Sequence, residues 1–326
     1  MLNIASSQFL ILLSGFICPS IGAKGPIGEM LDVAAELKPM GLGVEYAEKH
    51  IEKVATNYEN QAYEAIERQV AGSVPIGKWA LNPELFVKEM TSKAKFPKSD
   101  TFLPEKLQNL KLKSHYKSSF GGVSGFGVYQ NIGQSTDELF ASLKNTNYDI
   151  TPYVSIGVEP KTAFVFFVNM ANDRIAFNYI PAPGFAYGLR LSPKWGINLG
   201  FPHFGLWAEP FDWFKLNFSM EPVSYLDGDL LIDTGSWFNL KFRILSQQET
   251  YKLENRQSTA DQLIYTSLTY STGINLKLGP ANFDLEGGWE MNRNFLETND
   301  YLRERKNHVL RLANGVMAKV QARANF

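Results

Sequence analysis

The sequence has few of the residues from which disulfide bonds and metal sites are built. Its 326 residues include a single cysteine, Cys18, and four histidines that lie far apart. One cysteine excludes a disulfide framework within the chain and a cysteine-based zinc site. The charges also cancel, because 33 acidic residues face 32 basic ones, whereas a nucleic-acid-binding protein carries a basic excess. We therefore expect no cofactor, no metal and no nucleic-acid partner.

The N-terminus lacks an apolar run long enough for a membrane-spanning helix. Residues 9–17 form an apolar run of about nine residues, whereas a spanning helix needs about 20. A run of this length is typical of the apolar region of a signal peptide, and Ala23 before Lys24 gives an acceptable cleavage site. We predict a signal peptide over residues 1–23, and hence export. The alternative is that the run forms a buried first helix of a cytosolic protein.

Residues 24–107 show apolar residues at helical spacing. The intervals of three and four between them predict an amphipathic helix. Asn82 and Pro83 then suggest the start of a second helix, with an N-cap followed by proline at the first helical position. We interpret 24–107 as a helical periplasmic segment or a barrel plug, and a small helical subdomain is the alternative. The apolar residues of the first helix are Val44, Ala47, Ile51, Val54, Tyr58, Ala62 and Ala65.

Residues 108–326 alternate between apolar and polar side chains, which predicts β-strands with one apolar and one polar face. A soluble sandwich alternates too, but the strands here are long, and aromatic residues, 13% of the chain, also lie at the strand ends. Long charged links at 247–262 and 293–307 flank a tight turn at 279–281. Transmembrane barrels alternate short turns and long loops in this way. The clearest alternating segments are 213–221, 237–245, 263–278, 283–291 and 308–326.

The last strand resembles the one that ends Gram-negative outer-membrane β-barrels. Phe326 is a terminal aromatic residue, and Ala324, Ala322 and Val320 alternate before it, although alanine replaces the bulkier residue usual at the third position from the end. Residues 183–202 also look like an uncharacterised porin-like subgroup. The resemblance implies an outer-membrane location, contact with outer-membrane lipid, and recognition of these four residues by the barrel-assembly machinery.

Prolines between residues 181 and 210 interrupt the middle of the barrel region, which predicts short strands there. We count ten to twelve strands and prefer twelve, because single-chain bacterial barrels have an even number. The expected fold is an all-β, antiparallel transmembrane barrel of about 12 strands over 108–326, preceded by the small α-helical segment.

The polar faces of the strands supply the candidate functional residues. With the apolar faces toward lipid, seven basic and four acidic side chains point into the lumen. The turn at 279–281 also places Lys277 almost opposite Asp284, close enough to form an ion pair. The lumen-facing candidates are Lys215, Glu221, Lys241, Arg243, Lys277, Asp284, Glu286, Glu290, Arg311, Lys319 and Arg323.

Two functions fit this interior. The first is a small porin-like channel for small solutes, in which the basic surplus favours anions. The second is a non-conducting structural barrel whose charges neutralise one another. Less favoured alternatives are a soluble periplasmic β-protein and an outer-membrane lipid hydrolase, for which His203 and His308 with Ser219, Ser236 and Ser267 would be candidates. Since no nucleophile motif is present, we predict no catalytic residues.

Overall fold

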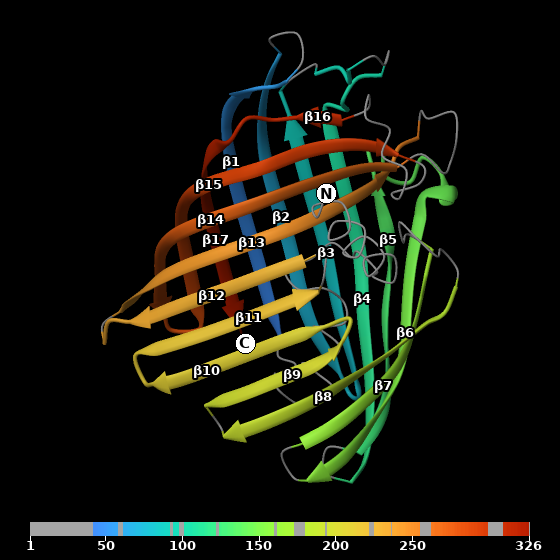
Figure 1. Ribbon diagram of the computed structural model, residues 1–326, viewed down its shortest axis with the longest axis vertical. Coiled ribbons are helices and arrows are strands. Elements are labelled where there is room, and N and C mark those ends of the chain that lie inside the picture. Colours follow the sequence, from blue (N-terminus) through green and yellow to red (C-terminus); the bar gives the residue numbers. More distant parts are fainter. Residues whose placement is uncertain are drawn as a thin grey trace, which may run out of the picture.

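The chain forms a closed antiparallel β-barrel in a computed structural model (Figure 1). The β-strands β8–β15 cross in front of β2–β7 in this view, as expected for tilted barrel strands. Among the described residues no helix is long and apolar enough to cross a membrane. The structure describes residues 42–57, 61–91, 94–97, 101–121, 124–159, 162–172, 180–192, 194–221, 225–235, 237–254, 262–298 and 309–325.

The strands fall into long and short groups. The four strands β9–β12 have only seven to nine residues each, whereas β13–β15 have 15 to 18. β9 and β10 have the short length that the prolines predict, but β8, which contains Pro183, has 11 residues. The elements are β1 (Gly43–Ala55), β2 (Ala62–Ile76), β3 (Trp79–Met90), β4 (Lys106–Gly121), β5 (Ser124–Thr136), the single-turn η1 (Leu143–Asn145), β6 (Thr146–Glu159), β7 (Thr162–Ala171), β8 (Ala182–Ser192), β9 (Trp195–Phe201), β10 (Phe204–Phe211), β11 (Phe214–Glu221), β12 (Tyr225–Asp233), β13 (Phe238–Lys252), β14 (Gln262–Leu278), β15 (Ala281–Thr298), β16 (Val309–Arg311) and β17 (Gly315–Asn325).

Each of the strands β1–β15 pairs with its neighbours in sequence, and the first and last described strands close the ring. β1 pairs with β2 on one side and with β17 on the other, so that Gly43 lies opposite both Ser73 and Asn325. β16 and β17 both pair with β15 and together occupy one place in the ring. The described residues therefore form a barrel of sixteen strand positions. Closure pairs the first described strand with the last, so that the membrane-spanning part of the sheet has no open edge among the described residues.

Two parts of the expected fold are wrong. The barrel has sixteen strands rather than about twelve, and the described part of residues 24–107 is built of β1–β3 and the start of β4, with no α-helix. The apolar residues at helical spacing come from both faces of a strand: Val44 is exposed on the outer wall, whereas Ala47 and Ile51 are buried inside. The predicted signal peptide, residues 1–23, lies outside the described residues.

The outer wall is apolar, and aromatic residues line one rim. Leu240, Phe242, Leu285 and Val320 are all 40–49% exposed although they are large and apolar. Such a surface is unfavourable in water and favourable against lipid. The rim with the tight turns carries exposed aromatic side chains, as the interfacial girdle of a membrane barrel does. These are Trp79, Trp195, Phe211, Trp213 and Trp237.

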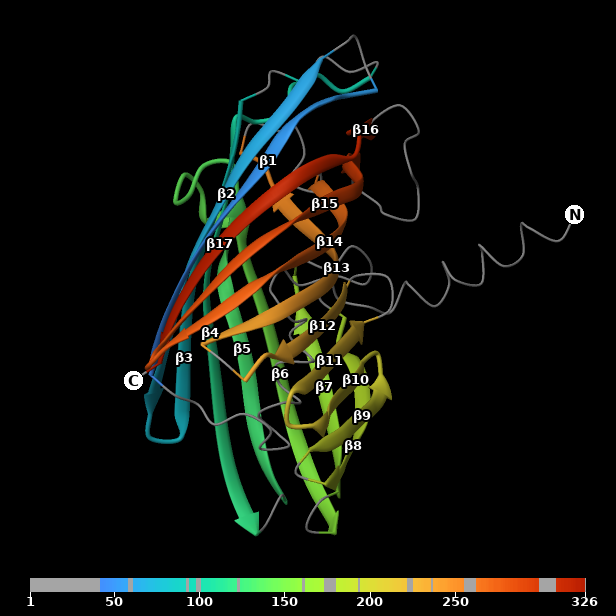
Figure 2. The same cartoon turned by 90° about the vertical axis from the view of Figure 1, so that its left-hand side faces the viewer.

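Loop lengths assign the two ends of the barrel. Residues 77–78, 212–213 and 279–280 form tight turns at the end where Asn325 lies, and Figure 2 shows the C-terminus beside the β2–β3 hairpin. The long links, such as 91–105 and 137–145, lie at the opposite end. Because outer-membrane barrels have short periplasmic turns and long outer loops, we refer to these as the periplasmic and outer ends.

One glycine in the short-strand wall leaves space that a neighbouring side chain fills. A Cβ added at Gly196 would lie 1.7 Å from ring carbons of Trp207, whereas Gly287 has open space. We expect Gly196→Ala to lower the free energy of unfolding by about 1–3 kcal/mol through overpacking, and Gly287→Ala to leave it nearly unchanged. Guanidinium unfolding of the two variants measures this, and equal midpoints would contradict the packing.

Candidate functional site

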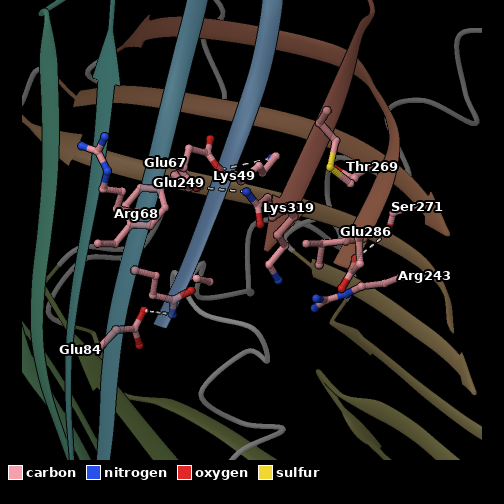
Figure 3. Close-up of a pocket in the computed structure, with 16 residues that line it drawn as sticks. Lys49, Glu67, Arg68, Glu84, Arg243, Glu249, Thr269, Ser271, Glu286 and Lys319 are labelled. Carbon is pink, nitrogen blue, oxygen red and sulfur yellow. Dashed lines mark hydrogen bonds and ion pairs between the residues drawn. The ribbon is translucent and has the colours of Figure 1, made fainter. Parts of the chain in front are cut away.

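The barrel interior contains a polar cavity of about 110 Å³ midway along its charged wall. β1–β3 line one side, and β13–β15 with β17 line the other (Figure 3). Arg243 and Lys319 point toward the same open space in this view. Thr269, Ser271 and Gln247 add hydroxyl and amide groups to the lining, while Phe86, Leu245 and Met317 add apolar surface. A cavity of this size and polarity accommodates several water molecules or part of a small solute.

Ion pairs dominate the side formed by β12–β15. Lys241 Nζ lies 2.9 Å from both Asp284 Oδ2 and Glu286 Oε1. Arg243 donates from Nε and Nη2 to the two carboxylate oxygens of Asp227, each at 3.0 Å. A bidentate guanidinium–carboxylate pair of this kind fixes both side chains. The charges on this wall are therefore held in place before any solute enters.

A second group of ion pairs crosses the interior. Lys88 Nζ on β3 lies 3.0 Å from Glu67 Oε1 and 2.9 Å from Glu249 Oε2 on β13. β3 and β13 are not neighbours in the ring, so this contact joins two separate parts of the wall. Lys49 bridges Glu290 at 2.8 Å and Glu67 at 3.3 Å. These charges are almost completely shielded from solvent, and their mutual pairing offsets the cost of burying them.

The predicted lumen residues occupy several levels of the barrel. Glu221, Glu286 and Glu290 are buried, Lys319 lines the cavity, and Arg311 is exposed at the outer end. Near the periplasmic end Lys215 lies 3.2 Å from Glu209, and Arg323 lies 2.6 Å from Glu45. Only part of the predicted set therefore meets at the cavity.

The predicted pair of Lys277 and Asp284 is wrong. Lys277 Nζ lies 2.9 Å from Asp233 Oδ2, and Lys277 is opposite Asn282 in the β14–β15 register. Asn275 is opposite Asp284 and donates to it at 2.6 Å. The tight turn at 279–280 therefore shifts the register by two residues from the expected one.

Several members of the ion-pair network were not among the predicted site residues. They lie in the segment that we interpreted as helical, and they are Lys49, Glu67, Glu84 and Lys88. Alternation was the available signal, because Glu84, Phe86 and Lys88 occupy every second position of β3. Together with Asp227 and Glu249, these acids compensate the basic surplus on which the expected anion preference rested.

The inner wall formed by β4–β8 has a different character. Tyr129, Tyr153, Val165 and Phe167 form a buried cluster there, and the Tyr153 hydroxyl lies 2.7 Å from Nε2 of His115. This part of the wall is therefore packed with aromatic and aliphatic side chains, whereas the cavity is lined by ion-paired residues.

Among the described residues no hydrogen bond joins a candidate histidine to a candidate serine, since the Ser219 hydroxyl and His203 Nδ1 are both buried without a hydrogen-bond partner. His203 Nδ1 lies 3.8 Å from Glu221 Oε1 at the end of β11. Ser267 lies on β14, far along the ring from β10 and β11. His308 and Ser236 lie outside the described residues. Within the described ranges no group of three or more histidine, cysteine or acidic side chains could hold a metal ion.

An apolar core fills part of the outer end of the interior. Its members come from β1–β4, β13–β16 and the link between β3 and β4, and eight of them are fully buried. The core separates the cavity from the outer rim on this side. Its largest side chains are Tyr63, Phe96, Tyr251, Tyr265 and Phe295.

Comparison with known proteins gives no family for the chain. No protein-family model matches it, and no curated protein does. Solved structures match over nearly the full length but at low similarity. The toluene transporter TodX of Pseudomonas putida has 9% identity and a TM-score of 0.39, covering 96% of this chain and 97% of its own. The monoaromatic hydrocarbon channel CymD has 11% identity and a TM-score of 0.41, and the match covers 94% of this chain and 95% of CymD. Pseudomonas putida OprB has 8% identity and a TM-score of 0.33, and the match covers 95% of this chain and 100% of OprB.

Because the similarity to these structures is so low, we assign the architecture from the strands of this chain itself. The barrel is closed, its described strand positions are even in number, its outer wall is apolar with an aromatic rim, and long links lie at the end opposite the tight turns. Together these are the properties of an outer-membrane β-barrel. The chain is such a barrel, which confirms the predicted class and location.

Proposed function

We propose that the barrel is a porin-like conduit that lets small solutes cross the outer membrane. The observation that carries this proposal is the combination of sixteen strands with a polar cavity between charged walls. Side chains fill a barrel of about eight strands, whereas one of 16–18 strands leaves room for an aqueous channel. The twelve strands expected from the sequence leave both outcomes open, and sixteen favour the conduit.

The charges suit weak selectivity rather than strong anion preference. Among the described cavity residues, Lys319 has no carboxylate within ion-pair distance, and its Nζ donates to Gln321 at 2.8 Å. The other charged residues of the lining are paired, as for Lys49, Glu67, Glu84, Arg243, Glu249 and Glu286. We propose that the lumen-facing charges orient passing solutes and that the protein catalyses no reaction.

Flux into vesicles tests the proposal. Purified, heat-modifiable protein is reconstituted into lipid vesicles, and swelling is followed in uncharged sugars of increasing size. We expect small sugars to enter faster than larger ones, because a lumen of fixed width excludes by size. Entry at the rate of protein-free vesicles for every sugar would instead favour the salt-bridged structural barrel.

A charge reversal at Lys319 should change ion selectivity. Lys319→Glu replaces one positive charge in the cavity with one negative charge. We therefore expect the permeability ratio of cations to anions to rise several-fold. The measurement is the reversal potential across a salt gradient.

Lys194→Glu is the matched control for this charge reversal. Lys194 lies in an exposed periplasmic turn, where its hydrogen bond holds the pKa of Asp212 below the usual value. Since this turn is outside the lumen, the control should leave the reversal potential unchanged. An equal shift in both variants would show that selectivity does not arise at the cavity.

A further inference from the structure

The outer ends of β13–β15 extend over the interior. We define the roof as residues 248–254, 262–267 and 292–298. Figure 1 shows β14 and β15 reaching across the upper part of the barrel, and the β13 strand contacts β5, which is not its neighbour in the ring. The inner side of the roof carries Tyr251, Leu253, Leu263, Tyr265 and Phe295 of the apolar core.

The roof begins where the strand ladders are interrupted. The β14–β15 register shifts between Thr266 and Leu268, and Asn292 opposite this shift has a φ of 51°. β15 stops pairing with β17 at Glu290 and resumes with β16 at Asn294. Bulges bend a strand and increase its twist. Interruptions on neighbouring strands thus form a line along which the roof turns inward.

One edge of the roof has no strand partner among the described residues. The β12–β13 ladder ends at Tyr225 opposite Gln247, so residues 248–252 of β13 continue without β12 beside them. Gln248 Nε2 and Thr250 Oγ1 on this edge are buried without a hydrogen-bond partner. Such groups cost free energy when buried. The backbone of this edge is paired on one side only, with β14, and Glu249 on the same segment is held by its ion pair with Lys88, which must break when this edge leaves the opposite wall.

A few polar contacts hold this edge against the opposite wall. The Glu254 backbone N–H donates to Asp137 Oδ1 at 3.0 Å, and Asn145 Nδ2 donates to Glu254 Oε1 at 2.7 Å. Lys252 Nζ donates to the Asn172 carbonyl oxygen at 3.3 Å. All three contacts join β13 or its end to the β5–β6 and β7–β8 links. No backbone ladder reinforces them, so they can break and re-form without disrupting the ring.

We propose that the roof is the gate of the conduit, held closed by these contacts and opened when its free β13 edge leaves the β5–β6 link. The inference rests on the proposed function. The gate would lie between the outer solution and the cavity, because the apolar core beneath the roof excludes water on the closed side. Movement along the line of bulges would carry this core away from the opposite wall.

A reversible cross-link tests the gate. Asp137→Cys and Glu254→Cys are combined with Cys18→Ser, which removes the only native cysteine, and a short bis-maleimide with an internal disulfide alkylates both thiols and joins the pair. We expect single-channel conductance to fall at least tenfold in the cross-linked protein and to return on reduction. The matched control joins Val44→Cys to Ala324→Cys, which are opposite each other on adjacent strands and lie on the outer face, and it should conduct equally in both states.

Conductance that is equal with and without the cross-link would overturn the gate while leaving the conduit intact. Silence of the wild-type protein would contradict the conduit itself. A second measurement then decides the gate, using Thr269→Cys in the cavity and a membrane-impermeant thiol reagent added from outside. Labelling should be several-fold faster when Asp137→Ala and Asn145→Ala loosen the roof, and an unchanged rate would overturn the gate.

Discussion

Lys88→Met should lower the free energy of unfolding by about 3–5 kcal/mol, the usual cost of removing one partner of a buried ion pair. Lys88 is fully buried between Glu67 and Glu249, and its Nζ also lies 3.5 Å from the ring centre of Tyr265. Methionine retains most of the side-chain volume, so packing changes little. The loss comes from leaving Glu249 buried without a cation, while Glu67 keeps only its longer contact with Lys49.

Reversible guanidinium unfolding from lipid vesicles, followed by tryptophan fluorescence, measures this effect. The matched control is Lys215→Met, because Lys215 is 40% exposed and its pair with Glu209 is open to solvent. Exposed pairs contribute only about 0–1 kcal/mol. Equal losses in the two variants would show that the contact across the interior does not hold the walls together.

Phe242→Arg should destabilise the barrel by about 2–4 kcal/mol, the cost of an arginine facing lipid near the bilayer midplane. Phe242 is 45% exposed on the apolar wall and follows Trp237 of the periplasmic rim by five residues. At roughly 3.3 Å per residue along a tilted strand, this places it near the middle of the apolar band.

Gln247→Arg on the same strand is the control for this substitution. Gln247 lines the cavity, and its amide donates to Glu249 at 3.1 Å. An arginine there would meet a carboxylate rather than lipid, so we expect a small change in unfolding free energy. If Gln247→Arg were the more damaging variant, the assignment of inner and outer faces would be reversed.

Strand alternation predicted the C-terminal half of the barrel well and the N-terminal part poorly. β14 and β15 have apolar residues on one face over a long stretch, such as Ile264, Leu268 and Ile274 on β14, and the period of two is clear. In β1 the outward face also carries Glu48 and His50, which form a surface network with Arg68. Because both faces then mix polar and apolar residues, helical spacing arises by coincidence.

The ion-pair network required the ring order, which local patterns do not contain. Sequence alternation identified Lys241 and Arg243 as residues of one polar face. Their partners Asp284 and Asp227 lie on β15 and β12, and their distances depend on register and on barrel curvature. Lys88 meets Glu249 across the interior, although β3 and β13 are not neighbours in the ring. Contacts of this kind follow from closure of the whole barrel.

Single-channel recording of the wild-type protein in a planar bilayer tests directly whether the barrel conducts solutes. The sample must first migrate differently on gels before and after boiling, which shows that the barrel is folded. The account predicts discrete conductance steps that close and reopen, since a sixteen-stranded barrel with a polar cavity is wide enough for an aqueous path. A silent bilayer from demonstrably folded and inserted protein would contradict it.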